Sequence, residues 1–235
     1  MRLSSQTSSN LFRKINEKLS AKPALRWLPK LWGYDTISYW HDRVDQMGAK
    51  SVYNKGHDDA ELSGVDEMQR EKIMPHFQQQ LRGDETRILD FGCGPGRFSG
   101  LLADLSGAEV VGADPMQKLL DAAPPHPKVS YRAIPETGEL PLADASVDVI
   151  WSCLVLGCIV DDRGIAKTHR EFQRILKPGG LLFIVENTAP LKSLHYFKFR
   201  EIDTYLAMFD FTPLDHLCDY YDKEERISIM CGRKI

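Results

Sequence analysis

Three glycines and two aspartates form the part of the sequence that is best suited to hold a charged ligand. Gly92, Gly94 and Gly96 directly follow the apolar run that contains Asp90. A backbone without side chains lets a ligand approach closely, and a helix after such a turn offers free N–H groups. Asp114 lies 24 residues after Asp90, at the end of the next apolar run. There a carboxylate can accept hydrogen bonds from both hydroxyls of a ribose.

The spacing of these glycines separates two kinds of nucleotide. A pyrophosphate-binding turn reads GxGxxG, whereas this turn reads GxGxG and Arg97 stands in place of the third glycine. The carboxylate of Asp90 also suits a cationic amine better than a phosphate. The turn therefore predicts a nucleoside that carries a positive charge, and it disfavours a nicotinamide-dependent oxidoreductase.

The length and composition indicate a single enzyme-sized domain. The chain has 235 residues, of which 43% are apolar, and this is enough for one substantial core. No stretch approaches the roughly 18 consecutive apolar residues of a membrane span, and the first residues lack the apolar core of a secretory signal. We expect a soluble, cytoplasmic protein. The five cysteines are widely spaced, which predicts reduced thiols and no metal site.

Charge is distributed unevenly along the chain. Residues 1–33 hold seven Lys and Arg against the single acid Glu17, so this leader carries +6 and residues 34–235 carry −9. The acidic body argues against long nucleic acids as substrates, because their binding draws on a basic surface. The leader also has apolar residues at helical spacing. It has two interpretations: a helix packed on the domain, which we favour, or peripheral contact with an anionic membrane.

Short apolar runs alternate with helical patterns on both sides of the glycines. Strands are predicted at 87–91, 108–113, 128–133, 147–152 and 181–186, with helices around 98–105, 116–123 and 163–176. This alternation is typical of an α/β doubly wound sheet, in which ligands lie across the carboxyl ends of the strands. Upstream, helices are predicted at 36–46 and 65–81.

The end of the chain departs from that rhythm. A helix is predicted at 199–209, followed by strands at 213–221 and 225–233 that form an antiparallel hairpin. The result is a mostly parallel, seven-stranded sheet with an N-terminal helical extension. We divide the chain into the basic leader at 1–33, a helical lid segment at 34–84 and a core at 85–235. The core contains a substrate-side insertion at about 188–211.

Four ordered motifs together resemble the class I S-adenosylmethionine-dependent methyltransferases. They cover about residues 87–187 and read "ILDFGCGPG", "VVGADPM", "ELPLADASVDVIWSCLVLGCI" and "REFQRILKPGGLLFIVE". The resemblance implies a Rossmann-like fold, S-adenosylmethionine as the cofactor and S-adenosylhomocysteine as the product.

The resemblance also implies roles at the methionine and ribose end of the cofactor. Gly92, Cys93 and Gly94 would line the methionine moiety, with Asp90 near its amino group and Asp114 on the ribose. The alternative is that both aspartates cap the helices that follow them.

At the adenine end, the resemblance places Pro115 and Met116 beside the ring. Glu136 would accept a hydrogen bond from the exocyclic amine, and Thr137 would offer its backbone. Cys153 would lie along the edge of the cofactor. For Glu136, a solvated position in the loop is the alternative.

One departure from the family concerns the proton acceptor. Many relatives carry a histidine pair where this chain reads Gly157 and Cys158, so no histidine base carries over to that position. A base is required only for a weakly acidic acceptor such as an alcohol, and positioning can supply most of the catalysis. The "KPGG" at 177–180 is predicted to be the turn into the fifth strand.

The acceptor pocket is predicted from the two segments outside the motifs. Tyr39, Trp40 and Tyr53 belong to the lid segment, and Tyr196 and Arg200 belong to the insertion. An apolar pocket with an arginine favours a flat or apolar acceptor with a carboxylate or phosphate. Core packing of the added segments is the alternative.

Two histidines are candidate general bases. His57 belongs to the lid segment and His195 to the insertion. A lone histidine is more often a hydrogen-bonded surface or core group, so that alternative stays open.

Three functions are compatible with the motifs. The first is methyl transfer to O, N or S of a small molecule, or of an exposed group on a larger metabolite, with the oligomeric state left open. The second is the same reaction at a membrane surface, on a lipid-linked, glycan or quinone-like acceptor. The third is a non-catalytic partner or scaffold protein.

Overall fold

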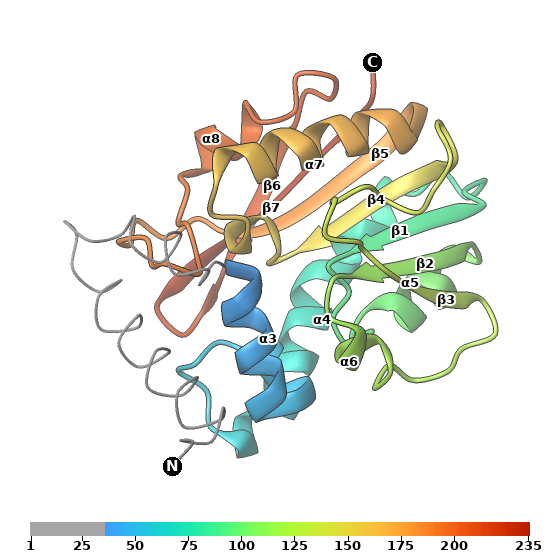
Figure 1. Cartoon of the computed structure of the whole chain (residues 1–235). Coiled ribbons are helices and arrows are strands. Elements are labelled where there is room, and N and C mark those ends of the chain that lie inside the picture. The colour runs from blue at the N-terminus through green and yellow to red at the C-terminus, as the bar shows by residue number, and fades with distance from the viewer. Residues whose placement is uncertain (1–35) are drawn as a thin grey trace, which may run out of the picture.

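A seven-stranded sheet forms the centre of the computed structural model, which describes residues 36–235 (Figure 1). The strand order is β3-β2-β1-β4-β5-β7-β6. The strands are β1 (Arg87–Phe91), β2 (Glu109–Asp114), β3 (Val129–Ala133), β4 (Val147–Cys153), β5 (Leu176–Asn187), β6 (Asp215–Asp222) and β7 (Glu225–Arg233). The first five strands pair in parallel, and β7 is antiparallel to both β5 and β6. This confirms the predicted fold class.

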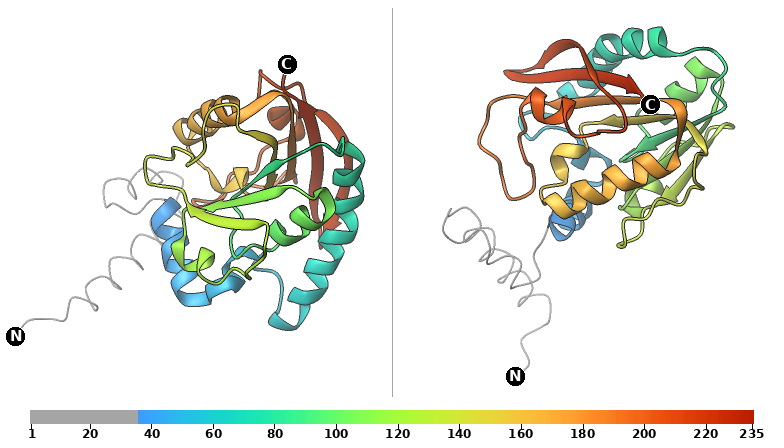
Figure 2. Two further views of the ribbon diagram at one scale, coloured as in Figure 1. Left: turned by 90° about the vertical axis from the view of Figure 1, so that its right-hand side faces the viewer. Right: turned by 90° about the horizontal axis from the view of Figure 1, so that it is seen from above.

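Helices cover both faces of the sheet, with α4 on one side and α7 on the other (Figure 2). The α-helices are α3 (Thr36–Met47), α4 (Leu62–Gln80), α5 (Ser99–Ser106), α6 (Gln117–Leu120), α7 (Asp162–Ile175) and α8 (Ile202–Leu206). Three short 3-10 helices are η2 (Gly48–Val52), η3 (Asp59–Glu61) and η4 (Leu156–Cys158).

The core consists of two apolar layers because the strands are buried on both faces, as in other parallel sheets. On the α4 and α5 side, Trp151 stacks on Phe183 with ring centroids 5.1 Å apart and meets Phe77 edge-on. On the α7 and α8 side, Phe172 and Tyr205 are fully buried. The sheet is thus a rigid support for the loops at its carboxyl edge.

Helix α3 lies beside the carboxyl ends of the parallel strands (Figure 1). Its Val44 packs against Met116 and Leu119, which lie between β2 and β3, and Trp40 and Val52 complete this small cluster. The lid segment is therefore attached to the edge of the sheet where a ligand is expected.

Two sequence predictions about helices are wrong in extent. The helix predicted at 199–209 spans Ile202–Leu206, because the buried Arg200 side chain fixes the preceding backbone in an extended path. The helix predicted at 116–123 spans Gln117–Leu120 and gives way to turns before Pro124.

The "KPGG" stretch is part of a strand and does not form the predicted turn. Strand β5 already begins at Leu176, which pairs with Val147, and Gly179 has a φ of +72° within it. The register between β4 and β5 shifts at this point, which is the signature of a bulge.

The structure bears on the two membrane hypotheses only in part. The basic leader and both of its interpretations lie outside the described residues. Within residues 36–235, no helix is long and apolar enough to cross a bilayer.

Candidate functional site

The glycine turn, Gly92 to Gly96, bends the backbone over the end of β2. The N–H groups of Gly92 and Cys93 both donate to the carbonyl oxygen of Ala113, at 2.7 and 3.2 Å. Gly92 has a φ of +69°, and a Cβ atom there would lie 2.4 Å from a methyl of Val155. Glycine is therefore required by the backbone conformation and by the close neighbour.

Two buried carboxylates flank this turn. Asp114 accepts hydrogen bonds from the backbone N–H of Gly94 at 3.0 Å and of Met116 at 2.8 Å. Asp90 accepts one from the Ser99 hydroxyl at 2.6 Å. Their exposed fractions are 7% and 3%. Asp114 thus fixes the turn to the end of β2, and Asp90 lies behind it at the end of β1.

Burial weakens the ionised form of both carboxylates. It raises the pKa of Asp90 to about 7, with the Asp114 charge as a smaller cause and the Ser99 hydroxyl opposing. It raises the pKa of Asp114 to about 6 against the two backbone N–H groups. No cationic side chain neutralises either carboxylate by an ion pair within residues 36–235. Two such groups are suited to a ligand with an ammonium group and hydroxyls.

The residues predicted for the adenine end lie beside the turn in different degrees of exposure. Met116 is buried, whereas Pro115, Glu136 and Thr137 are exposed. The loop that holds Glu136 begins next to β2, because the N–H of Ile134 donates to the carbonyl oxygen of Asp114 at 3.0 Å. These assignments stay predictions.

The two predicted cysteines differ in burial. Cys93 lies in the turn and is buried, whereas Cys153 ends β4 and is half-buried. Burial raises the pKa of both thiols well above the ordinary range. Both thiols therefore remain protonated and apolar in character. This is expected for side chains that form the wall of a binding site, and it makes them unsuited to act as nucleophiles.

A cavity opens beside the turn and receives side chains from segments far apart in the sequence. The lid segment, the end of the turn, the backbone after β4, the insertion and the β6–β7 hairpin all contribute. Tyr39, Trp40, Tyr53 and Tyr196, all predicted for the acceptor pocket, line it. Val52 lines the cavity as well, and it would be 3.0 Å from a Cβ atom at Gly94. The turn and the cavity are therefore adjacent.

Aromatic rings join the lid segment to the insertion. Tyr39 stacks on Tyr196 with centroids 4.2 Å apart, and Trp40 and His195 meet Tyr39 edge-on. The Lys55 ammonium lies 4.5 Å from the centroid of the Tyr196 ring. The structure thus brings the two predicted acceptor segments together, with His195 in the ring cluster.

Arg97 connects the turn to α4. Its guanidinium donates to Asp66 and to Gln69, and it lies 4.5 Å above the ring of Tyr53. The Tyr53 hydroxyl donates to the same Asp66 at 2.8 Å. The sequence analysis used Arg97 only to reject a dinucleotide. A charged residue at the end of a glycine turn could also have indicated that Arg97 forms a wall of the cavity.

His57 lies between two carboxylates. Its Nε2 is 2.7 Å from Asp222 at the end of β6, and its Nδ1 is 3.3 Å from Glu61. Lys223 also pairs with Glu61, and its ammonium reaches the carbonyl oxygen of Gly56. In this arrangement His57 fastens the lid segment to the hairpin, and its role as a base stays a prediction.

A buried carboxylate missed by sequence reasoning holds the backbone after β4. Glu186, fully buried in β5, accepts hydrogen bonds from the N–H groups of Val155, Leu156 and Gly157. Burial raises its pKa to about 7, although these N–H groups favour the ionised form. A charged residue at the end of the apolar run "LLFIV" was the signal for it.

Arg200 fastens the other side of the same backbone. Its guanidinium donates to the carbonyl oxygens of Leu156 and Ile159, at 2.9 and 2.7 Å. It is buried there and is not among the side chains that line the cavity. Its predicted contact with an acceptor stays a prediction.

Gly157, at the departure from the family pattern, makes room for the insertion. A Cβ atom at this position would lie 2.3 Å from the ring of Phe197. The carbonyl oxygen of Gly157 also accepts the N–H of Lys198 at 2.8 Å. The absence of a side chain therefore allows the insertion to dock over η4, and Phe197 lines the cavity.

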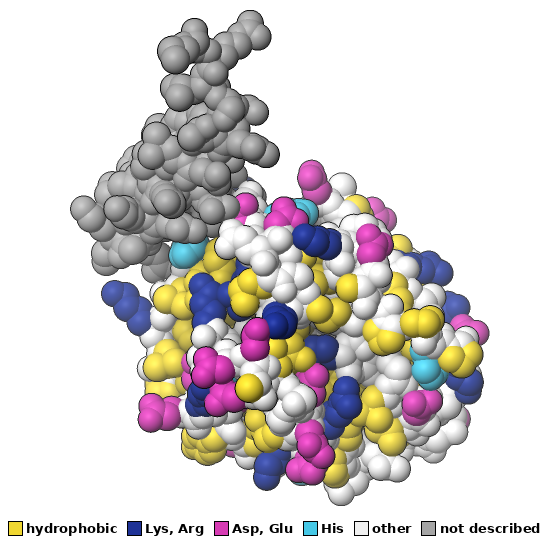
Figure 3. Space-filling model, turned by 90° about the horizontal axis from the view of Figure 1, so that it is seen from below, with side chains coloured by type: hydrophobic (Ala, Val, Ile, Leu, Met, Phe, Trp, Pro, Cys, Tyr) yellow, Lys and Arg dark blue, Asp and Glu magenta, His cyan; other side chains and the backbone are white. Residues whose placement is uncertain are grey.

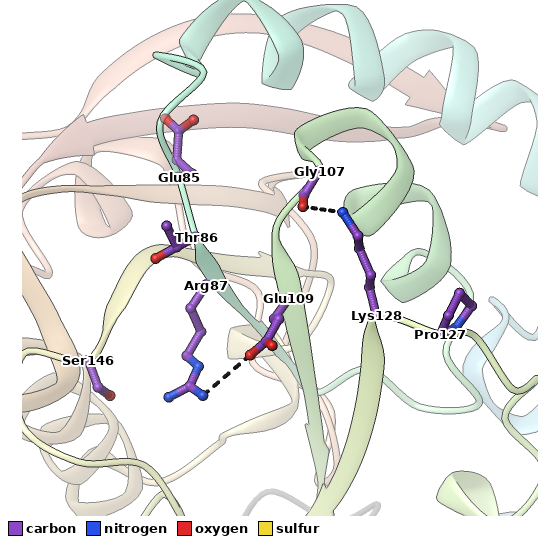
Figure 4. A pocket seen from close by; sticks show the side chains of 8 residues that line it. All are labelled: Glu85, Thr86, Arg87, Gly107, Glu109, Pro127, Lys128 and Ser146. Carbon is purple, nitrogen blue, oxygen red and sulfur yellow. Dashed lines mark hydrogen bonds and ion pairs between the residues drawn. The ribbon is translucent and has the colours of Figure 1, made fainter.

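A second hollow lies at the opposite edge of the sheet (Figure 4). Lys128 donates to the carbonyl oxygen of Gly107 at 2.6 Å, and Arg87 faces Glu109 at 3.5 Å. It is formed at the amino ends of the strands, and ligands of open α/β sheets bind at the carboxyl ends.

The described residues form no metal centre, and charges of both signs are mixed on one face of the molecule. In residues 36–235, no three His, Cys, Asp or Glu side chains converge as a metal site would require. Seen from below, Lys and Arg side chains are interspersed with Asp and Glu (Figure 3). The expected absence of nucleic acid substrates stays a prediction.

Comparison with known proteins places this site in a family. The methyltransferase domain model matches residues 89–184, which include the glycine turn and Asp114. The chain is 35% identical over 124 residues to the biotin biosynthesis bifunctional protein BioHC of Cellvibrio japonicus, covering 52% of this chain and 24% of that protein. It is 34% identical over 106 residues to the N-demethylindolmycin N-methyltransferase of Streptomyces griseus, covering 44% of each. The chain thus spans less than half the length of these two relatives.

A solved structure supports the fold independently. The S-adenosylmethionine-dependent methyltransferase from Mesorhizobium loti superposes with a TM-score of 0.54 at 19% identity, over 68% of this chain and 96% of that one. At this identity the likeness bears on the fold alone. Residues 89–184 thus match the methyltransferase domain family, and the strand order and the glycine turn with its two carboxylates support the class I S-adenosylmethionine-dependent methyltransferase fold for this domain.

Proposed function

We propose that this protein transfers the methyl group of S-adenosylmethionine to an oxygen, nitrogen or sulfur atom of a small molecule or of an exposed group on a larger metabolite. The observation that carries the proposal is the pair of buried carboxylates around the glycine turn, next to a cavity. A scaffold protein would gain nothing from two buried acids that no side chain of residues 36–235 neutralises by an ion pair, because each costs folding free energy.

The residues of the turn fit the methionine and ribose parts of this cofactor. Gly92 and Gly94 leave the backbone bare and the Cys93 side chain between them is buried, Asp90 offers a carboxylate to the ammonium group, and Asp114 offers one to the ribose hydroxyls. Met116 provides a buried apolar surface for the adenine, and Cys153 extends the wall along β4. The exposed loop with Glu136 and Thr137 would have to close over the adenine edge.

The side chains of this protein act by binding, orienting and excluding water. When bound, the cofactor supplies a methyl group on a sulfonium, and the sulfur keeps the electron pair of the C–S bond as the acceptor lone pair forms the new bond. Glu186 and Arg200 hold the backbone at 155–159 from two sides and so fix the wall that the acceptor must pass. Alignment of this kind supplies most of the rate in an in-line displacement.

The cavity on the acceptor side favours a small-molecule methyl acceptor over a polymer. The lid segment and the insertion meet over the cavity through the Tyr39–Tyr196 stack, which limits the space for a large substrate. The relatives support varied chemistry, since one of them is an N-methyltransferase of an indolmycin precursor by name. The membrane-surface variant depends on residues 1–33, outside the described part of the chain.

Calorimetry with S-adenosylmethionine and S-adenosylhomocysteine tests the proposal. We expect saturable binding of both and a rise in the melting temperature, because a ligand that binds only the native state stabilises it. NAD⁺ serves as the control ligand and should do neither. Absence of binding by both sulfur nucleosides would overturn the proposed function and favour a scaffold.

A further inference from the structure

Two buried hydrogen-bond donors of the cavity lack a partner. Tyr39 is 8% exposed, and burial raises the pKa of its hydroxyl although Arg43 and Tyr196 lie close enough to lower it. No group accepts the proton of this hydroxyl at hydrogen-bond geometry within residues 36–235. The indole Nε1 of Trp40 is buried and unpartnered in the same part of the chain. Both residues line the cavity. Buried donors are almost always satisfied, so an acceptor group from a ligand is the natural partner for these two.

Two cations lie next to these donors without a carboxylate partner in the described residues. Lys55 holds its ammonium over the faces of Tyr196 and Tyr39, at 4.5 and 5.3 Å from the ring centroids. Arg43 donates to the backbone oxygens of Ser51 and Tyr53, at 2.7 and 2.9 Å. Backbone oxygens and ring faces hold a cation in place without neutralising its charge, and Lys55 is exposed at the mouth of the cavity, so its ammonium stays available to an anionic ligand.

The acids of the cavity are already engaged elsewhere. Asp222 lies 2.7 Å from the His57 ring nitrogen, and Glu225 accepts from the side-chain amide of Asn187. The third cation, Arg97, is paired with Asp66. The unsatisfied donors and uncompensated charge therefore gather around α3 and Lys55.

Apolar side chains form much of the remaining surface of the cavity. They are Leu154, Leu194, Phe197, Phe199 and Ile227. A ligand that satisfies the whole cavity thus has an apolar body and one anionic group that accepts several hydrogen bonds.

We propose that Lys55, together with the Tyr39 hydroxyl and the Trp40 indole N–H, binds a carboxylate of the methyl acceptor, whose apolar body lies against the insertion. This assignment rests on the proposed function and names the acceptor class: small apolar carboxylic acids. Arg43 adds charge from the next turn of α3. A charge-assisted hydrogen bond to such a group is about twice as strong as a neutral one, which makes Lys55 the main determinant of specificity.

Matched probes test this assignment on the full chain saturated with S-adenosylhomocysteine. Benzoate and benzamide have the same shape and differ in charge, so their dissociation constants isolate the recognition of the anion. We expect benzoate to bind about tenfold more tightly than benzamide. Lys55→Met should remove this preference, Lys55→Arg should retain it, and Tyr39→Phe should reduce it about threefold.

Lys50→Met is the matched control, because Lys50 lies shortly before Lys55, in η2, but pairs with Asp59 at the surface. It should leave the preference for benzoate intact. Equal binding of benzoate and benzamide by the unaltered protein would overturn the assignment while cofactor binding stands. If the unaltered protein fails to bind S-adenosylhomocysteine, the proposed function itself fails.

The cofactor also carries a carboxylate that could bind Lys55. A second pair of ligands distinguishes this carboxylate from that of the methyl acceptor. 5′-Methylthioadenosine lacks the amino acid part of S-adenosylhomocysteine. Under our proposal, Lys55→Met changes the affinity for neither nucleoside. A tenfold loss for S-adenosylhomocysteine alone would show that Lys55 binds the cofactor and would overturn the acceptor assignment.

Discussion

The glycine turn and the cavity beside it are in contact through Val52, yet the chain builds them in different ways. All the groups of the turn come from two consecutive β-α connections between Asp90 and Met116. The cavity requires residues from Tyr39 to Ile227, brought together by ring stacking and ion pairs. The first depends on local backbone geometry, and the second depends on the tertiary structure. Substitutions should therefore affect the two regions separately.

The largest expected effect comes from Gly92→Ala. The new methyl group would lie 2.4 Å from Val155 at a φ of +69°, so the turn must move. We expect the affinity for S-adenosylhomocysteine, measured by calorimetry, to fall at least about 100-fold through strain and displacement of the turn. Gly107→Ala is the control, because it has a φ of +72° but no atom within 4 Å of its Cβ. Equal binding by the two variants would contradict a turn built by local geometry.

Asp114→Asn should have the next largest effect. The amide offers one acceptor where the carboxylate receives two backbone N–H groups, and it loses the charge toward the ribose hydroxyls. A loss of about 2 kcal/mol, or roughly 30-fold in affinity, is expected by calorimetry. Asp148→Asn tests the specificity of this result, because Asp148 accepts the N–H groups of Thr86 and Arg87 at the other edge of the sheet. It should lower the melting temperature and leave affinity unchanged.

A change in pH should affect the stability of the ligand-free protein and its affinity for S-adenosylhomocysteine in opposite directions. Asp90 and Glu186 have pKa values raised to about 7 and Asp114 to about 6, so the native state binds more protons than the unfolded state from about pH 4 to 7. The stability of the ligand-free protein therefore falls as the pH rises through this window, by at least about 10 °C in melting temperature. Affinity for S-adenosylhomocysteine rises about tenfold over the same range, because the ionised carboxylates bind it. A flat stability profile in this window would contradict the raised pKa values, and Asp90→Asn should reduce the slope.

The smallest effect is expected from a substitution at the contact between the lid segment and the β6–β7 hairpin. His57→Ala removes the contacts to Asp222 and Glu61, which should expose the segment to limited proteolysis and weaken S-adenosylhomocysteine binding about threefold. His216→Ala is the control, since His216 pairs with Asp219 on the surface of β6. Identical digestion of the two variants would mean that the cavity does not depend on this tie.

The same comparison explains how much the sequence alone could predict. The period of the apolar runs and the spacing of the glycines are local signals, so the seven strands, the turn and the position of Asp114 followed from them. The pairing of Tyr39 with Tyr196 and of His57 with Asp222 joins residues more than 150 positions apart. No local pattern encodes such contacts, and the backbone partners of Arg200 could not be predicted from the sequence for the same reason.

The extent of the helix near residue 200 was unpredictable for a related reason. The sequence from Phe199 to Phe209 has helical periodicity, but Arg200 gains more by donating to Leu156 and Ile159 than a further helical turn would provide. Tertiary hydrogen bonds of a charged group outweigh helix propensity, which amounts to less than about 1 kcal/mol per residue.

The carboxylate of Glu186 has a consequence for how such enzymes diverge. It positions residues 155–157 from within the sheet, without help from the lid segment or from most of the insertion. The lid segment can therefore exchange side chains such as Lys55 without shifting the wall that, under the proposed function, faces the reacting methyl group. New substrates can be acquired one substitution at a time on this frame, while the geometry of the transfer is inherited unchanged.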